Sequence, residues 1–222
     1  MPPKPKFTRE EVVSAALGLV REKGADALTS RGLGEYLGCS SCPIFTLFAD
    51  MDDLKKEVGK KAKALFDSYM EVAEEYTPAY KKRGMQWVKF ASEEKQLFRM
   101  LFMERVIPDS DFDHAIRAIP FGKDRDINII MRDYRASAAQ AEFIFSQMWI
   151  YTYGLCTLSA TGVCEFCEDE VSARLSTVFG GLIASVKSGV KDITPVMADS
   201  SDGKAITKQH PDLGRETPEN NR

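Results

Sequence analysis

Apolar residues recur every three to four positions along most of this chain, between patterns that begin and end helices. Thr8 and Glu11 form the capping-box pattern at the start of one helix, and Gly24 is placed to end it. Asp50, with Asp53 three residues later, is placed to begin another. The strict alternation of apolar and polar residues that marks β-strands is scarce. We therefore predict an all-α fold.

The pattern predicts helices up to Lys187 and a polar tail after it. The expected helices span residues 8–24, 29–38, 40–48, 50–76, 77–91, 94–106, 137–161 and 169–187, with two short ones between 109 and 134. The expected apolar stripe of the helix over 50–76 consists of Leu54, Val58, Ala62, Leu65, Tyr69 and Val72. Residues 191–222 have a polar composition typical of disorder.

Composition and charge fit a globular protein of the cytoplasm. The chain is 44% hydrophobic and 28% charged, with a net charge of −3. Five cysteines, an odd number, do not suggest a disulfide scaffold, and the N-terminus lacks the apolar core of a secretory signal. Residues 143–164 carry no charge, but hydroxyl and amide side chains interrupt the run. We expect a buried helix there rather than a membrane span.

The most informative stretch, residues 29–48, has the pattern of a helix-turn-helix. Two short capped helices flank a glycine-containing turn. The apolar residues expected to face inward are Leu33, Leu37, Ile44 and Phe48. Ser40, Ser41 and Thr46 place hydroxyl groups near the start of the second helix, where free backbone N–H groups favour a phosphate. A plain helical hairpin within an ordinary all-α domain fits the same spacing.

At this point the sequence resembles the tetracycline-repressor (TetR) family of transcriptional regulators over residues 7–66. The segments TREEVVSAALGLVREKGADALTSRGLGEYLGCS and FADMDDL, with Phe45 and Phe48, carry the resemblance. It implies an N-terminal three-helix DNA-binding domain over residues 1–50, which extends into the next helix to about residue 66. The helix that begins at Ser40 would be the recognition helix, and Lys4 and Lys6 would lie on an arm near the DNA backbone.

Three positions depart from the family pattern. Phe45 replaces a tyrosine whose hydroxyl contacts phosphate, Leu47 replaces a frequent histidine, and Met51 replaces a frequent lysine. We therefore expect the phosphate contacts to rely more on basic side chains and backbone amides. The expected DNA-contacting residues are Lys4, Lys6, Thr29, Arg31, Ser40, Ser41, Cys42, Pro43, Phe45, Thr46 and Lys55.

Residues 80–187 resemble the ligand-binding half of a TetR subgroup named for a Trp, a His and a Gly on one helix. Trp149 and Gly154 match, whereas Tyr153 stands where the histidine usually is. The resemblance implies a C-terminal helical domain over residues 51–190 that binds a ligand and forms a homodimer. The expected dimer residues are Trp149, Gly154, Leu175, Val178 and Leu182. The expected ligand-binding residues, each of which also suits an ordinary core, are Phe98, Phe102, Met131, Phe143, Met148, Trp149 and Tyr153.

Together these patterns predict a DNA-binding transcriptional regulator, a repressor released by a small apolar or aromatic ligand. Its partners would be a second copy of the chain, that ligand and a near-palindromic double-stranded operator. Cys39/Cys42 and Cys164/Cys167 have C-x-x-C spacing, so a thiol- or metal-responsive regulator is one alternative. A helical interaction module with a vestigial DNA motif is the other. No catalytic motif is present, and we expect no enzyme activity, cofactor or bound metal.

Overall fold

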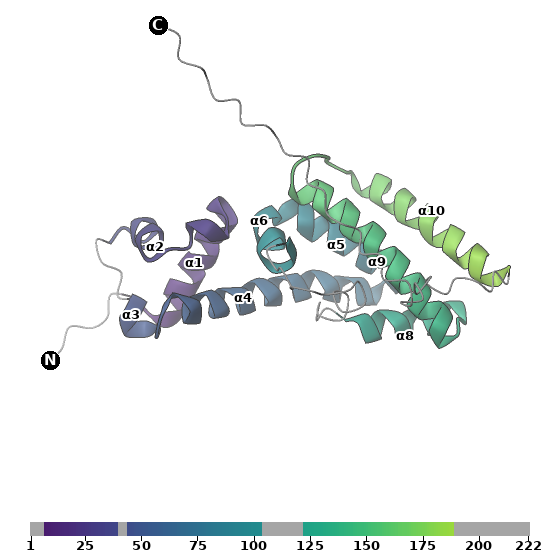
Figure 1. Ribbon diagram of the computed structural model, residues 1–222, viewed down its shortest axis with the longest axis horizontal. Helices are drawn as coiled ribbons and strands as arrows, with labels where there is room; N and C mark the ends of the chain where they lie inside the picture. Colours follow the sequence, from purple (N-terminus) through teal and green to yellow (C-terminus); the bar gives the residue numbers. More distant parts are fainter. Residues whose placement is uncertain (1–6, 40–43, 104–121, 189–222) are drawn as a thin grey trace, which may run out of the picture. The chain divides into compact units, whose positions relative to one another are not determined.

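Every regular element in the described part of the chain is a helix (Figure 1). The computed structural model describes residues 7–39, 44–103 and 122–188. Its α-helices are α1 (Arg9–Lys23), α2 (Ser30–Tyr36), α3 (Ile44–Leu47), α4 (Met51–Glu71), α5 (Ala79–Glu93), α6 (Lys95–Phe98), α8 (Lys123–Tyr134), α9 (Ala138–Ala160) and α10 (Glu168–Lys187). Three short segments join them: η1 (Ala25–Ala27), η2 (Val72–Glu75) and the π-helical η3 (Arg99–Met103). The all-α prediction is confirmed.

The helix starts follow the local caps that the sequence predicts. At α1 the Thr8 hydroxyl accepts from the Glu11 amide at 3.2 Å, and the Glu11 carboxylate accepts from the Thr8 amide at 2.7 Å. The Asp50 carboxylate accepts from the Asp53 amide at 2.8 Å and caps α4. Gly24, with φ of +85°, ends α1 as expected. These caps satisfy backbone groups that a helix end would otherwise leave without partners.

The buried face of α4 differs from the predicted stripe in its second half. Leu54, Val58 and Ala62 are buried as expected, but the stripe continues through Phe66 and Met70. The predicted Leu65 and Tyr69 are half-buried, and Val72 is exposed. The prediction was wrong there because steps of three and of four residues both continue a helical stripe, and the neighbouring helices select between them.

The described residues lie in the first of two units of the chain, Met1–Gly189. Within the first unit α5 packs against α4, α9 and α10, and α8 packs against α9. α1 packs against α4 and α6, while α9 and α10 lie side by side (Figure 1). None of the helices described here is long and apolar enough to cross a membrane.

Two predicted segments are covered only in part. The helix expected over 94–106 is divided into α6 and η3, and residues 104–106 lie outside the described residues. Of the two helices expected between 109 and 134, α8 is observed, and residues 109–121 lie outside the described part. The expected tail over residues 191–222 lies outside it as well.

Candidate functional site

The region predicted to be a helix-turn-helix, residues 29–48, contains the short helices α2 and α3. The Thr29 hydroxyl accepts from the Gly32 amide at 3.0 Å and caps α2. Gly38 follows α2 with φ of +64°, a backbone conformation that glycine adopts without a steric cost. The Cys39 amide then donates to the Gly34 carbonyl at 3.0 Å. This turn ends α2.

The apolar residues of this region face inward, as the sequence predicts. Leu33, Ile44 and Phe48 are buried, and Leu37 is half-buried. Phe45, in contrast, has 65% of its surface exposed. α3 therefore buries one face against the other N-terminal helices and leaves the opposite face open to a partner.

Arg9 joins the end of α3 to the start of α4, a role that the sequence patterns did not indicate. Its guanidinium donates to the Leu47 carbonyl at 2.5 Å and to the Asp53 carboxylate at 3.2 Å. It also lies over the Phe48 ring, 4.2 Å from the centroid. One side chain of α1 thus holds the end of α3 against the start of α4.

The described residues predicted to contact DNA are all exposed. Thr29, Arg31, Phe45, Thr46 and Lys55 are at the surface of α2, α3 and α4. Arg31 pairs with Glu35 at 3.0 Å, and Lys55 pairs with Asp52 at 3.6 Å, both on their own helices. Such exposed pairs are weak and exchange readily for phosphate contacts. The other predicted contacts lie outside the described residues: Lys4, Lys6, Ser40, Ser41, Cys42 and Pro43.

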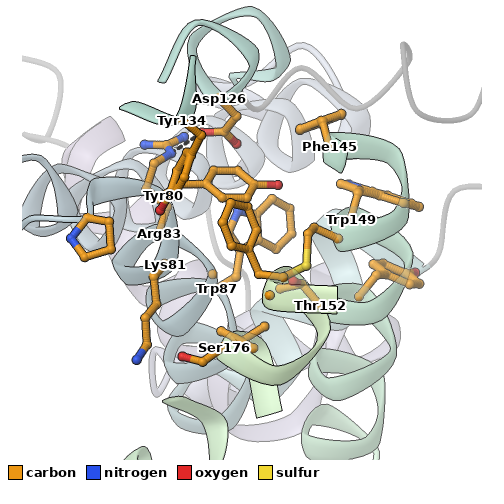
Figure 2. A pocket seen from close by; sticks show the side chains of 17 residues that line it. Tyr80, Lys81, Arg83, Trp87, Asp126, Tyr134, Phe145, Trp149, Thr152 and Ser176 are labelled. Carbon is orange, nitrogen blue, oxygen red and sulfur yellow. Dashed lines mark hydrogen bonds and ion pairs between the residues drawn. The ribbon is translucent and has the colours of Figure 1, made fainter. Parts of the chain in front are cut away.

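A cavity of about 200 Å³ lies among α5, α8, α9 and α10 (Figure 2). A buried apolar cavity of ~150 Å³ holds one benzene ring, so this one has room for one or two rings. Rings dominate its walls: Tyr80, Trp87, Tyr134, Phe145, Trp149, Tyr153 and Phe179. The Trp149 and Tyr153 rings stack with their centroids 5.1 Å apart. Such a lining suits a flat apolar molecule.

One wall of the cavity carries a buried ion pair. Arg83 of α5 is only 4% exposed, and its Nε donates to an oxygen of Asp126 on α8. Gly122, at φ of +89°, leaves room for the guanidinium, because a Cβ there would stand 3.0 Å from Arg83 Nη2. Within the described part of the chain, Arg83 Nη1 is buried without an acceptor. A buried donor without a partner costs about 1–3 kcal/mol.

Burial raises the pKa values of three ionisable residues that line the cavity. Burial raises the pKa of the Asp126 carboxyl to about 6, against the opposing effect of Arg83. Burial likewise raises the pKa of Tyr80 well above its usual range, and that of Tyr134. Both phenols, whose residues line the cavity, therefore stay protonated at neutral pH.

No protein-family model matches this chain. No curated protein matches it either. The resemblance to the TetR family therefore stays a prediction.

Three of the seven predicted ligand-binding residues line the cavity: Met148, Trp149 and Tyr153. Phe98 and Phe102 are instead core residues on α6 and η3, and the Tyr153 hydroxyl donates to the Phe102 carbonyl at 3.0 Å. The other two, Met131 and Phe143, are half-buried against the core and do not line the cavity. The predicted ligand-binding residues thus contribute to the α9 wall of the cavity, and its other walls consist of residues outside that prediction.

The missed residues lie mainly on α5 and α8. Tyr80, Arg83 and Trp87 fall on one face of α5 at spacings of three and four, which the sequence shows. This spacing predicts that the three residues share a helix face. It does not show whether that face lines a cavity or packs into a core, because both have the same local pattern. Asp126 gives no local signal at all, because its role depends on the docking of α8 against α5.

The predicted dimer residues have different surroundings. Gly154 is exposed, and Val178 and Leu182 are half-buried. Trp149 lines the cavity, and Leu175 is buried against α5, where a Cβ at Gly84 would be 3.1 Å from it. Ile150 and Leu158 are exposed at spacings of four from Gly154, so α9 presents an apolar face that the described part of the chain leaves uncovered.

The cysteines provide no metal site in the described residues. No group of three or more His, Cys, Asp or Glu side chains comes together there. Cys39 and Cys164 are half-buried, Cys156 is buried and Cys167 is exposed, all as free thiols. Burial raises the pKa of Cys156 well above its usual range, so this thiol stays protonated and unreactive.

Proposed function

We propose that this chain is a cytoplasmic, homodimeric DNA-binding regulator of the TetR kind, a repressor released by a small aromatic or apolar ligand. The supporting observation is the one-sided burial of α3, which follows α2 across a glycine turn. Ile44 and Phe48 anchor it, while Phe45 and Thr46 stay exposed on its other face. A helix held in this way can lie in a major groove and present its outer residues to base edges and phosphates.

The uncovered face of α9 supports the homodimer. α9 carries apolar residues on all sides, and such a helix is normally covered on all sides. A twofold partner that covers Ile150 and Leu158 would bring two copies of α3 to one DNA duplex. Half-sites about 34–36 Å apart, one helical turn, would then form a near-palindromic operator.

Two connections support control of DNA binding by the cavity. α4 begins directly after the helix-turn-helix, and its Phe66 ring lies 4.8 Å from the Trp87 ring of the cavity wall. Arg21 of α1 forms an ion pair with the buried Glu94 beyond α5. A ligand that favours one arrangement of α5 would change the placement of α1 and α4, and it would weaken DNA binding by that difference in affinity.

The decisive experiment selects DNA from a random pool with the full chain and measures affinity for the selected sequence by gel shift. We expect a near-palindrome, and binding that weakens as salt rises because phosphate contacts release counterions. Arg31→Gln should lower affinity and reduce the salt slope by about one. Arg132→Gln is the matched control, since Arg132 is also an exposed arginine paired with a neighbouring acid, Asp133, but on α8. Failure to enrich any sequence would refute the proposal.

The dimer is tested by sedimentation equilibrium. Ile150→Glu should shift the protein toward monomer, because a charge would be buried in the α9 interface. Val72→Glu is the control, since Val72 and Ile150 are each 46% exposed. A wild-type monomer, or equal behaviour of the two variants, would contradict the proposed interface.

A further inference from the structure

The buried ion pair and two of the apolar lining residues lie on opposite sides of the cavity. Tyr80, Arg83 and Asp126 lie together on one side of Figure 2, whereas Phe145 and Trp149 lie on the opposite side. A ligand that satisfies both walls has a flat apolar body and one polar end. The cavity of about 200 Å³ limits the body to one or two rings.

The charges on the lining favour an anionic polar end. Among the described residues that line the cavity, Lys81 and Arg83 are basic and Asp126 is the one acid. Asp126 already accepts from Arg83 Nε, so the acid is engaged within the protein. A cationic ligand would have to compete with Arg83 for that carboxylate, whereas an anion would meet an excess of positive charge.

The hydrogen-bonding groups point to the same chemistry. Arg83 is 4% exposed, and its Nη1 is a buried donor that no acceptor in the described residues satisfies. The Tyr80 side chain on the same wall carries a further O–H donor. Donors therefore exceed acceptors at this end, and a planar carboxylate pairs with a guanidinium better than any neutral acceptor does.

We propose that the cavity binds a small aromatic carboxylic acid, with its carboxylate on Arg83 and its ring among Trp87, Phe145 and Trp149. This inference rests on the proposed ligand-controlled regulator and specifies its ligand class. Lys81 adds a longer-range attraction, and the burial of the Arg83 wall protects the contact from screening by salt.

Three probes of similar shape but different charge test the proposed ligand class, an aromatic carboxylic acid. The probes are 4-methylbenzoate, 4-methylbenzamide and 4-methylbenzamidine, which carry negative, zero and positive charge at neutral pH. The chain has two tryptophans, Trp87 and Trp149, and both line the cavity, so tryptophan fluorescence reports its occupancy. Calorimetry supplies the affinities. We expect the benzoate to bind at least about tenfold more tightly than the amide, and the amidine most weakly.

A double variant tests whether the tighter binding of the benzoate depends on the Arg83–Asp126 ion pair. Arg83→Gln with Asp126→Asn removes both charges but keeps two side chains that can hydrogen-bond to each other. In this variant benzoate and benzamide should bind with affinities within about twofold of each other. Should the variant unfold, the three-probe ranking on the wild-type chain still decides the matter. Equal or tighter binding of the amide or the amidine overturns the proposal, and so does a lack of binding by all three probes.

A gel shift on the selected operator separates this inference from the proposed function. Benzoate binding without operator binding would leave the ligand class standing and refute the regulator. Operator binding that only the amide or the amidine releases would keep the regulator and overturn the aromatic acid. Release by the benzoate, lost in the double variant, supports both.

Discussion

Phe66 provides the sharpest test of the packing that connects α4 to the cavity. Its side chain is 1% exposed, and its ring makes edge contacts with the rings of Trp87, Phe90 and Phe102 at 4.8–5.2 Å between centroids. Truncation of a buried phenylalanine to alanine costs about 3–5 kcal/mol through lost transfer energy and the cavity left behind. Each aromatic contact contributes about 0.5–1.5 kcal/mol beyond burial, which places Phe66→Ala near the upper end of that range.

The measurement is urea unfolding followed by far-UV circular dichroism at one fixed protein concentration, because dimerisation would couple stability to concentration. Val72→Ala, in η2 directly after α4, is the control, and it should change stability by less than about 0.5 kcal/mol since Val72 is exposed. The two variants also separate the observed stripe of α4 from the one predicted from sequence, which ran through Val72. A loss below about 1 kcal/mol for Phe66→Ala, or a larger loss for Val72→Ala, would refute the packing described here.

Three further predictions concern single side chains. Because burial raises the pKa of Asp126 from its ordinary 3.8 to about 6, the folded state binds a proton more tightly than the unfolded chain. The stability of the wild type relative to Asp126→Asn should then fall by on the order of 3 kcal/mol as pH rises from ~3 to ~7 in urea titrations; a wild type that instead loses stability relative to Asp126→Asn as pH falls would mean that Arg83 keeps the carboxyl ionised. Thr8→Ala removes the hydroxyl that caps α1 and should cost about 1 kcal/mol by thermal unfolding, with an unchanged midpoint as the contrary result. Glu94→Gln weakens the ion pair with Arg21 and should speed amide hydrogen exchange in α1 more than in α9; equal changes would show that the pair does not hold α1.

The helix starts were predictable because their determinants are local. Thr8 and Glu11 lie within one turn of each other, as do Asp50 and Asp53, so the sequence contains the whole interaction. The face of α4 beyond Ala62 was not predictable in this way. Leu65 and Phe66 both continue an apolar stripe, and the rings of α5 and η3 select Phe66.

The cavity was predictable on one wall. Met148, Trp149 and Tyr153 belong to a single helix with a recognisable aromatic pattern. Arg83 and Asp126 are 43 positions apart, and their pairing depends on how α8 docks against α5. An aromatic residue in the sequence can line a cavity or belong to the core. Phe98, for example, was predicted to bind the ligand but is buried in the core.

The same rings that make the cavity also limit how a ligand could act on DNA binding. Trp87 lines the cavity and also contacts the Phe66 ring, so a shift of Trp87 must be absorbed by α4 or by a repacked core. Close-packed interiors resist small continuous deformations and change between discrete packings. α4 begins at the Asp50 cap, and Arg9 joins its first turn to the end of α3. A change of packing at Phe66 would therefore move α4 together with the α3 end rather than bend the connection between them, and that coupled movement is how we expect the cavity to alter the spacing of two recognition helices.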